Sequence, residues 1–502
     1  MDFDDSVNAG GGLAALTEDG PTELQRRRWY ALIVVSIGAF MTPFDASIVA
    51  VALPAMGADL QLSYSQGLWA QAAYLLVTSV LLIPAGRLAD SRGLVRFYLL
   101  GTAIFGLGSV VAAFSPSGTI MILARCIQGV GGAFMFATSV AIVTAAFPVR
   151  ERGKALGLNT MATYLGLTLG PVLGGLIVTY ADWRWIFFIN VPIAAATLAA
   201  GWSLIGIERR DRLAAKTLRP SRHIDFAGAV LLGGALVALF VPLTFSPLWG
   251  WSSARTIGPL VVAVLLFAAF VLVEDRVREP MLDLDLLRKN RVFRGANTAA
   301  LISYMAVFGA VTLTAVFLQI VQGLSAQQAG LVLLAQPVLM AVLSPFTGRL
   351  SDRVGSRVLA TLGMVLVAGG MLQLSFVSTS TGPVLFALGT IGLGMAFFSA
   401  PNISAIMGSV DRSQLSLASG FLSTMRFTGQ GISMAVLGAI AAWSLGAEGA
   451  RIIFLGDTGS AASAAAFADG YQLAMLVGAV LAAVGAAISW TARPERRRGP
   501  SG

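Results

Sequence analysis

Cysteine, histidine and charge are all scarce in this sequence of 502 residues. Cys126 is the one cysteine and His223 the one histidine, which excludes an internal disulfide and a metal centre built from several thiolates or imidazoles. The GxxxxGK[ST] phosphate loop is also missing, since "RERGKALG" has the Gly-Lys pair without the rest. Because the apolar segments hold no cluster of acids either, we expect no metal, no cofactor and no enzymatic activity.

Charged residues make up only 12% of the chain, whereas soluble proteins carry about a quarter. Apolar residues reach 56% and form long runs. Since about 20 apolar residues cross a bilayer as a helix, the sequence predicts an all-α integral membrane protein with fourteen transmembrane helices. The predicted spans lie near 30–52, 66–86, 97–114, 119–143, 155–180, 186–206, 226–245, 257–273, 296–321, 329–347, 358–376, 383–407, 418–443 and 471–491.

The net charge of +9 is distributed unevenly along the chain. If the N-terminus is cytosolic, 29 of the 34 Lys and Arg residues fall in the tails and the cytosolic loops. Only Arg184, Arg255 and Arg451 fall in outer loops. This bias predicts a multi-pass protein of the plasma (cell inner) membrane with both termini cytoplasmic. The basic excess is then a topology signal, so we expect contact with membrane lipids and no binding of nucleic acid.

The chain contains an internal repeat. "GRLADSRG" at 86–93 returns as "GRLSDRVG" at 348–355, 262 residues later. Both copies follow an even-numbered predicted span, which is typical of transporters with two similar halves. The predicted organisation is an N-tail (1–28), a six-helix bundle (29–207), a linker (208–225), two additional helices (226–273), a second linker (274–294), a second six-helix bundle (295–492) and a basic C-tail (493–502).

Several short segments carry a resemblance to a known family. In order they are "FDASIVAVALP" (44–54), "GRLADSRGLVR" (86–96), "LARCIQGVGGA" (123–133), "GLTLGPVLGGL" (166–176) and "DWRWIFFINVP" (182–192). Because it contains all five segments in this order, the chain resembles the fourteen-span drug/proton antiporter group of the major facilitator superfamily. Two residues depart from its first-span motif, because Ser47 and Ala50 stand where the group usually has Thr and Asn.

The resemblance implies a proton-coupled exporter of amphipathic small molecules, a multidrug efflux carrier that works by alternating access and is monomeric. A dedicated lipid or metabolite carrier of the same fold is the alternative. A single deep carboxylate would suit neutral or monocationic substrates better than dications.

Asp45 is the one carboxylate that we place deep in a predicted span. It lies about seven residues from the outer end of its span, or ~10 Å, and Arg125 lies ~9 Å from the outer end of the fourth. We therefore hypothesise that the two side chains face one central cavity, where a moving cation changes the affinity of the carboxylate for a proton. The alternative is an ion pair that only holds the first bundle together.

Other polar residues within spans are candidates for the cavity wall: Gln71, Tyr74, Asn159, Tyr164, Asn297, Tyr304, Gln319, Gln336, Asn402 and Arg426. Arg426 could instead reach the cytosolic headgroups, and each of the others could serve only as an interhelical hydrogen-bonding group. Conformational gating is assigned to the repeated motif and to a glycine row with its proline: Gly86, Arg87, Asp90, Gly93, Gly348, Arg349, Asp352, Gly166, Gly170, Pro171 and Gly174. The row could form a seal or pivot between the bundles, or could serve ordinary helix packing.

Overall fold

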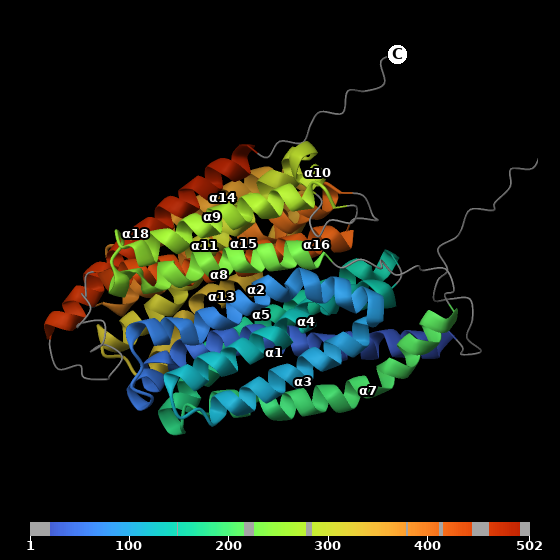
Figure 1. Cartoon of the computed structure of the whole chain (residues 1–502), viewed down its shortest axis with the longest axis horizontal. Coiled ribbons are helices and arrows are strands. Elements are labelled where there is room, and N and C mark those ends of the chain that lie inside the picture. Colours follow the sequence, from blue (N-terminus) through green and yellow to red (C-terminus); the bar gives the residue numbers. More distant parts are fainter. Residues whose placement is uncertain are drawn as a thin grey trace, which may run out of the picture.

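The computed structural model describes residues 21–147, 149–214, 225–277, 284–377, 380–410, 415–443 and 461–491. Every regular element in this part of the chain is a helix (Figure 1). The first half contains α1 (Pro21–Asp59), α2 (Tyr64–Arg92), α3 (Leu94–Ala113), α4 (Gly118–Ala146), α5 (Val149–Tyr180), α6 (Trp185–Phe188) and α7 (Asn190–Ala214). Two helices follow, α8 (Phe226–Trp249) and α9 (Ala254–Glu274). The second half contains α10 (Leu284–Lys289), α11 (Arg291–Ile320), α12 (Ala326–Leu333), α13 (Ala335–Val354), α14 (Ser356–Leu374), α15 (Thr381–Gly408), α16 (Leu415–Trp443) and α18 (Ala461–Thr491).

The all-helical membrane architecture is confirmed, whereas the count of fourteen spans stays a prediction. Thirteen helices of the described residues are long and apolar enough to cross a membrane. The remaining predicted span corresponds to α16, which is a 29-residue helix but is not among the thirteen. Its sequence includes Arg426 and Gln430, and these polar residues make the helix less hydrophobic than the other predicted spans.

The two halves of the chain lie alongside one another in Figure 1, the first in blue to green and the second in yellow to red. Residues from both halves share one buried apolar cluster, which includes Val51 and Leu53 of α1 and Leu313 and Phe317 of α11. Helix α8 packs against both α2 and α16, and α9 packs on α8. The two additional helices therefore cover one side of the seam between the halves.

The internal repeat extends beyond the motif that revealed it. Ser63 and Gln66 form a capping box that starts α2, and Ser325 and Gln328 form the same box at the start of α12. Both pairs are separated by 262 residues, the offset of the loop motif. A capping box satisfies two backbone donors that would otherwise lack partners at a helix start. The halves thus share the chemistry that begins their second spans.

The repeated motif is helical, where the sequence predicts a loop. Helix α2 runs to Arg92 and α3 begins at Leu94, so Gly93 alone makes the turn. Gly355 does the same between α13 and α14. Both glycines have positive φ, 128° and 94°, a region that residues with a Cβ adopt only under strain. The last position of each motif is therefore fixed by backbone conformation.

Gly355 provides a direct test of this backbone constraint. A Cβ added there meets nothing within 4 Å, so Gly355→Ala should destabilise the fold through strain alone, by about 1–3 kcal/mol. A lower thermal unfolding temperature of the purified carrier in detergent would show it. Gly369, which is helical and also has open space around it, is the matched control, since Gly369→Ala should stabilise by about 0.5–1 kcal/mol. Equal effects of the two changes would contradict the assignment.

Candidate functional site

Asp45 and Arg125 form an ion pair in the interior of the first half. Arg125 Nη1 of α4 donates to Asp45 Oδ2 of α1, and both side chains are fully buried. Helix α1 continues to Asp59, so Asp45 lies about 21 Å along the helix axis from that end. The pair is therefore in direct contact and well inside the bundle.

Amide side chains complete the surroundings of the carboxylate. Gln128 Nε2 and Asn190 Nδ2 donate to Asp45 Oδ1 at 3.1 and 2.8 Å. Arg125 in turn donates to the Ala70 carbonyl at 2.8 Å and to Gln128 Oε1 at 2.6 Å. These groups come from α1, α2, α4 and α7, and Gln128 Nε2 also donates to Ser109 Oγ of α3 at 2.8 Å. Such bonds offset part of the several kcal/mol that burying each charge costs.

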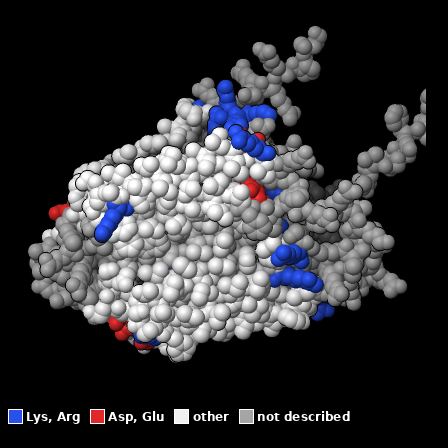
Figure 2. Space-filling view, in the orientation of Figure 1, with Lys and Arg blue, Asp and Glu red and all other residues white. Residues whose placement is uncertain are grey.

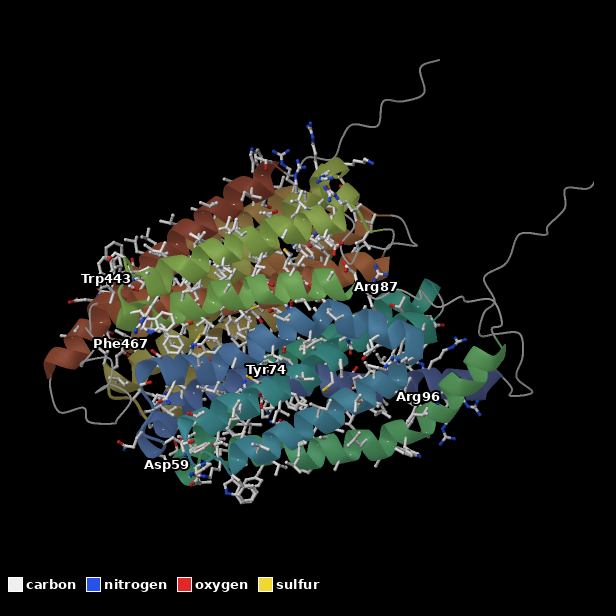
Figure 3. The ribbon with its side chains drawn as sticks, in the orientation of Figure 1. Asp59, Tyr74, Arg87, Arg96, Trp443 and Phe467 are labelled. Carbon is white, nitrogen blue, oxygen red and sulfur yellow. The ribbon has the colours of Figure 1, made fainter. Side chains whose placement is uncertain are left out.

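Tyr74 and Phe187 pack against the cation. The Arg125 guanidinium carbon lies 4.8 Å from the centre of the Tyr74 ring and 6.0 Å from that of Phe187. Figure 3 labels Tyr74 in the middle of the first half. Its hydroxyl is buried and has no hydrogen-bond partner among the described residues, and the same holds for Arg125 Nη2 and Asn190 Oδ1. The network therefore keeps unused hydrogen-bonding capacity beside the carboxylate.

Gln128 and Asn190 are site residues that the sequence reasoning missed. Both lie in segments that carry the family resemblance. Gln128 follows Arg125 by three residues in "LARCIQGVGGA", and Asn190 lies in "DWRWIFFINVP". The spacing of three places Gln128 on the same helix face as Arg125, which could have indicated its role. Asn190 carried a weaker signal, an amide among apolar residues.

A cavity of about 100 Å³ lies between the two halves. It is smaller than the roughly 300–1,000 Å³ of typical ligand sites, so a drug-sized molecule requires the halves to separate. Its lining comes from both halves: Ala46, Ser47, Ala50, Gln71, Leu167, Pro171, Tyr304, Val307, Phe308, Val311, Thr312, Leu333, Gln336, Pro337, Met340, Met395 and Gln430.

The ion pair does not face this cavity, contrary to the sequence-based hypothesis. Ala46, the next residue of α1, lines it, whereas Asp45 points into the first half toward α4 and α7. Adjacent helical residues are rotated by about 100° around the axis, which accounts for the difference. The carboxylate therefore lies one helix thickness behind the cavity wall.

Three of the predicted wall residues, Gln71, Tyr304 and Gln336, line the cavity. The other seven are outside its lining. Asn159 bonds to Ser139 at 3.3 Å and Asn297 to the Phe293 carbonyl at 2.9 Å. The remaining ones are Tyr74, Tyr164, Gln319, Asn402 and Arg426. The Asn159 bond is the interhelical alternative, whereas the Asn297 bond lies within α11.

The glycine row joins α5 to α1 within the first half, which matches the second of its two suggested roles, ordinary helix packing. A side chain at Gly166, Gly170 or Gly174 would meet α1 at Phe40, Ser47 or Ile48, respectively. The neighbouring Pro171 and Gly175 make the contact with the second half. Their partners in α12 are Gly330 and Ala326, and this tight backbone approach joins the halves.

More bonds join the halves toward the end of the molecule where α1 finishes, here called the Asp59 end. Thr312 Oγ1 donates to Gln71 Oε1 at 2.9 Å, and Gln319 Nε2 to the Val51 carbonyl at 3.2 Å. Tyr180 Oη donates to Gln327 Oε1 at 3.3 Å. Within the described residues, the two halves are therefore in contact toward the Asp59 end.

The motif side chains are described in part. Gly86 and Gly348 occupy matched positions, where an added Cβ lies 3.8 Å from Ala137 and 3.9 Å from Ala400, respectively. The side chains of Asp90, Arg349 and Asp352 lie outside the described residues, so the role assigned to them and to Arg87 stays a prediction. Figure 3 labels Arg87 and Arg96 at the end of the molecule opposite Asp59.

Figure 2 shows a broad belt without Lys, Arg, Asp or Glu between the two ends of the molecule. The belt suits a lipid environment. Two similar helical halves, a cavity between them and a buried charge network in one half define a membrane carrier built from internal repeats.

Comparison with known proteins identifies the family. The chain belongs to the Major Facilitator Superfamily, whose profile matches residues 35–434, which confirms the resemblance seen in the motifs. It is 36% identical over 427 residues to Multidrug resistance protein Stp of Mycobacterium tuberculosis, covering 84% of this chain and 77% of that protein. It is 32% identical over 425 residues to the Tetracenomycin C resistance and export protein of Streptomyces glaucescens, covering 84% and 78%. Among solved structures, a D-xylose-proton symporter has the same fold, with a TM-score of 0.65, 14% identity and 93% and 98% coverage.

Proposed function

We propose that this protein is a proton-coupled secondary exporter of amphipathic small molecules that works by alternating access. Its relatives include proteins described as multidrug resistance and export proteins. The observation that carries the proton coupling is the buried network of Asp45, Arg125, Gln128 and Asn190, which is separated from the cavity by α1 alone. One helix thus has the substrate wall on one side and the carboxylate on the other.

In the proposed cycle, movement of α1 relative to α4 exchanges the partners of Asp45. Contact with Arg125 favours the ionised carboxylate, and loss of that contact favours the protonated acid. The unused hydrogen-bonding groups of Tyr74, Arg125 and Asn190 can take over bonds as the pair separates. Substrate in the cavity pushes on Ala46, Ser47 and Ala50 of the same helix, which links its binding to proton release.

The membrane arrangement that we propose is fourteen spans, with α16 as the fourteenth, in the cell inner membrane with both termini cytoplasmic. The Asp59 end is then the outer end, and the structure represents a carrier closed to the outside. The monomer contains both halves of the cavity, so we propose a monomeric working unit.

Proton movement in reconstituted vesicles tests the proposed function. The purified protein is reconstituted in proteoliposomes that contain a pH-sensitive dye. Fluorescent amphipathic compounds are then added outside, one at a time, so that each has an inward concentration gradient. We expect at least one compound to enter and to raise the pH of the lumen, because protons leave as substrate enters. Addition of a proton ionophore should remove the pH signal and leave the uptake.

Uptake without any pH change would refute proton coupling while leaving a carrier. Specific uptake of a lipid or a single metabolite, with none of the panel, would support the dedicated carrier in place of the exporter of varied compounds.

A further inference from the structure

The cavity between the halves is uncharged. None of the described residues that line it is Asp, Glu, Lys, Arg or His. Asp45 does not supply a charge to it, because its side chain is fully buried on the far side of α1 and is paired with Arg125. An organic cation that entered this cavity would leave water without meeting a carboxylate, and an unpaired charge in a low-dielectric site is costly.

The second half of the chain supplies free hydrogen-bonding groups to the cavity. Tyr304, Gln336 and Gln430 reach it from α11, α13 and α16, and their side chains make no hydrogen bond within the described part of the chain. The first half offers less, because Gln71 is already bonded to Thr312 and to the Ala46 carbonyl. Two amides and a phenol provide both donors and acceptors, which suits carbonyl and hydroxyl groups on a substrate.

The apolar part of the wall favours aromatic and other polarisable surfaces. Phe308, Met340 and Met395 line the cavity. Methionine sulfur makes favourable contacts with aromatic rings, and its flexible side chain adapts to different shapes. Together with the amides, these residues favour an aromatic body with a small number of polar substituents.

Arg426 adds a positive charge next to this site. It precedes Gln430 by four residues on α16, one helical turn or about 6 Å away, and so lies on the same helix face. Its guanidinium carbon lies 5.2 Å from the centre of the Phe136 ring and 4.8 Å from that of Phe427. No described carboxylate forms an ion pair with it, and its Nε is buried without a hydrogen-bond partner. The local potential is therefore positive, and it attracts anions and repels cations.

We propose that the cavity selects uncharged or anionic aromatic molecules that bear carbonyl or hydroxyl groups, and rejects organic cations. Tyr304, Gln336 and Gln430 bind the polar substituents, and Arg426 sets the preference for charge. This inference rests on the proposed function, because it names the substrate class of the same cavity. It also replaces the monocations that the sequence suggested, since the carboxylate expected to meet them faces away.

Three probes with one ring system test the charge preference: anthracene-9-methanol (neutral), anthracene-9-carboxylate (anionic) and (anthracen-9-ylmethyl)trimethylammonium (cationic). Uptake into proteoliposomes and binding in detergent are followed by anthracene fluorescence, with protein-free vesicles as the blank. At zero membrane potential, the neutral and anionic probes should bind and be transported. The cation should bind at least about tenfold more weakly than the anion.

Variants then assign the preference to residues. Arg426→Gln should lower the ratio of anion to cation affinity by about tenfold and leave the neutral probe nearly unchanged, whereas Arg426→Lys should keep most of the ratio. Gln430→Leu should weaken the two oxygen-bearing probes together, because it removes a hydrogen-bonding group. Arg255→Gln, which removes an exposed cation from the first turn of α9, should change nothing and serves as the control.

Failure of the inference and failure of the proposed function give different results. If the wild-type protein binds or transports the cation as well as the anion, or if Arg426→Gln leaves their ratio unchanged, the selectivity proposal is wrong while a carrier remains. If no probe and no compound of the wider panel is transported, the proposed function itself fails. Probe affinities in detergent keep the selectivity measurable for a variant that transports poorly.

Discussion

Asp45→Asn should abolish proton-driven transport, with exchange falling about 100-fold or more, while the protein still enters the membrane. The substitution keeps the size and the planar shape of the side chain, but asparagine does not bind or release a proton. Intramembrane carboxylates of transporters serve as proton relays. The measurement is substrate uptake driven by an imposed pH gradient in proteoliposomes. Counterflow of substrate against substrate, with no gradient, should survive, because it does not require proton exchange.

Asp59→Asn is the matched control on the same helix. Asp59 ends α1, and its carboxylate is 46% exposed and lies 2.9 Å from the Arg184 guanidinium. Exposed ion pairs contribute about 0–1 kcal/mol to stability, so exchange by this variant should stay near the wild-type rate. A similar loss in both variants would show that charge on α1 in general, and not the buried carboxylate, is needed.

A double variant separates the coupling role of Asp45 from a purely structural role. Asp45→Asn alone leaves Arg125 buried without its ion pair, which costs about 3–5 kcal/mol in other proteins. Asp45→Asn with Arg125→Gln removes both charges and should recover much of the unfolding temperature, but not the response to a pH gradient. Recovery of proton-driven exchange by the double variant would support the ion pair as a packing device only.

The rarity of charge in apolar segments made Asp45 and Arg125 predictable from the sequence. Their partners were harder to identify, because Gln128 and Asn190 come from helices that meet only in the folded bundle. The sequence also did not predict which side of α1 faces the cavity. Buried residues surround α1, and Val49, Val51 and Ala52 are all fully enclosed, so its sequence has no polar stripe to mark its orientation.

The glycine row was also predicted only in part from the sequence. Spacing of four in Gly166, Gly170 and Gly174 predicts a close helix contact, and the structure has one. The identity of the partner depends on the rotation of α5, which the spacing does not specify. The repeat was the more informative pattern, because backbone conformation requires glycine at Gly93 and Gly355 whatever their neighbours.

Gly330→Leu should prevent closure of the Asp59 end and reduce transport about 100-fold or more. Gly330 of α12 lies directly against the backbone of Pro171, and Pro171 belongs to a helix that the glycine row holds on α1. Backbone in a packed core has little freedom to move aside. A leucine side chain therefore separates α12 from α5, and a carrier that does not close one end does not complete the cycle.

Distances between spin labels report the closure directly. With Cys126→Ser as background, since Cys126 is the only native cysteine, labels at Tyr180→Cys and Gln327→Cys flank the contact between α5 and α12. The parent should show a short distance, and Gly330→Leu a longer one together with the loss of transport. Gly369→Leu puts the same side chain on a helical glycine with open space around it, and both readouts should stay at parent values. Normal transport by Gly330→Leu with the short distance intact would mean that the α5–α12 contact is not the surface that closes, and that the bonds of Gln71 and Gln319 hold the Asp59 end by themselves.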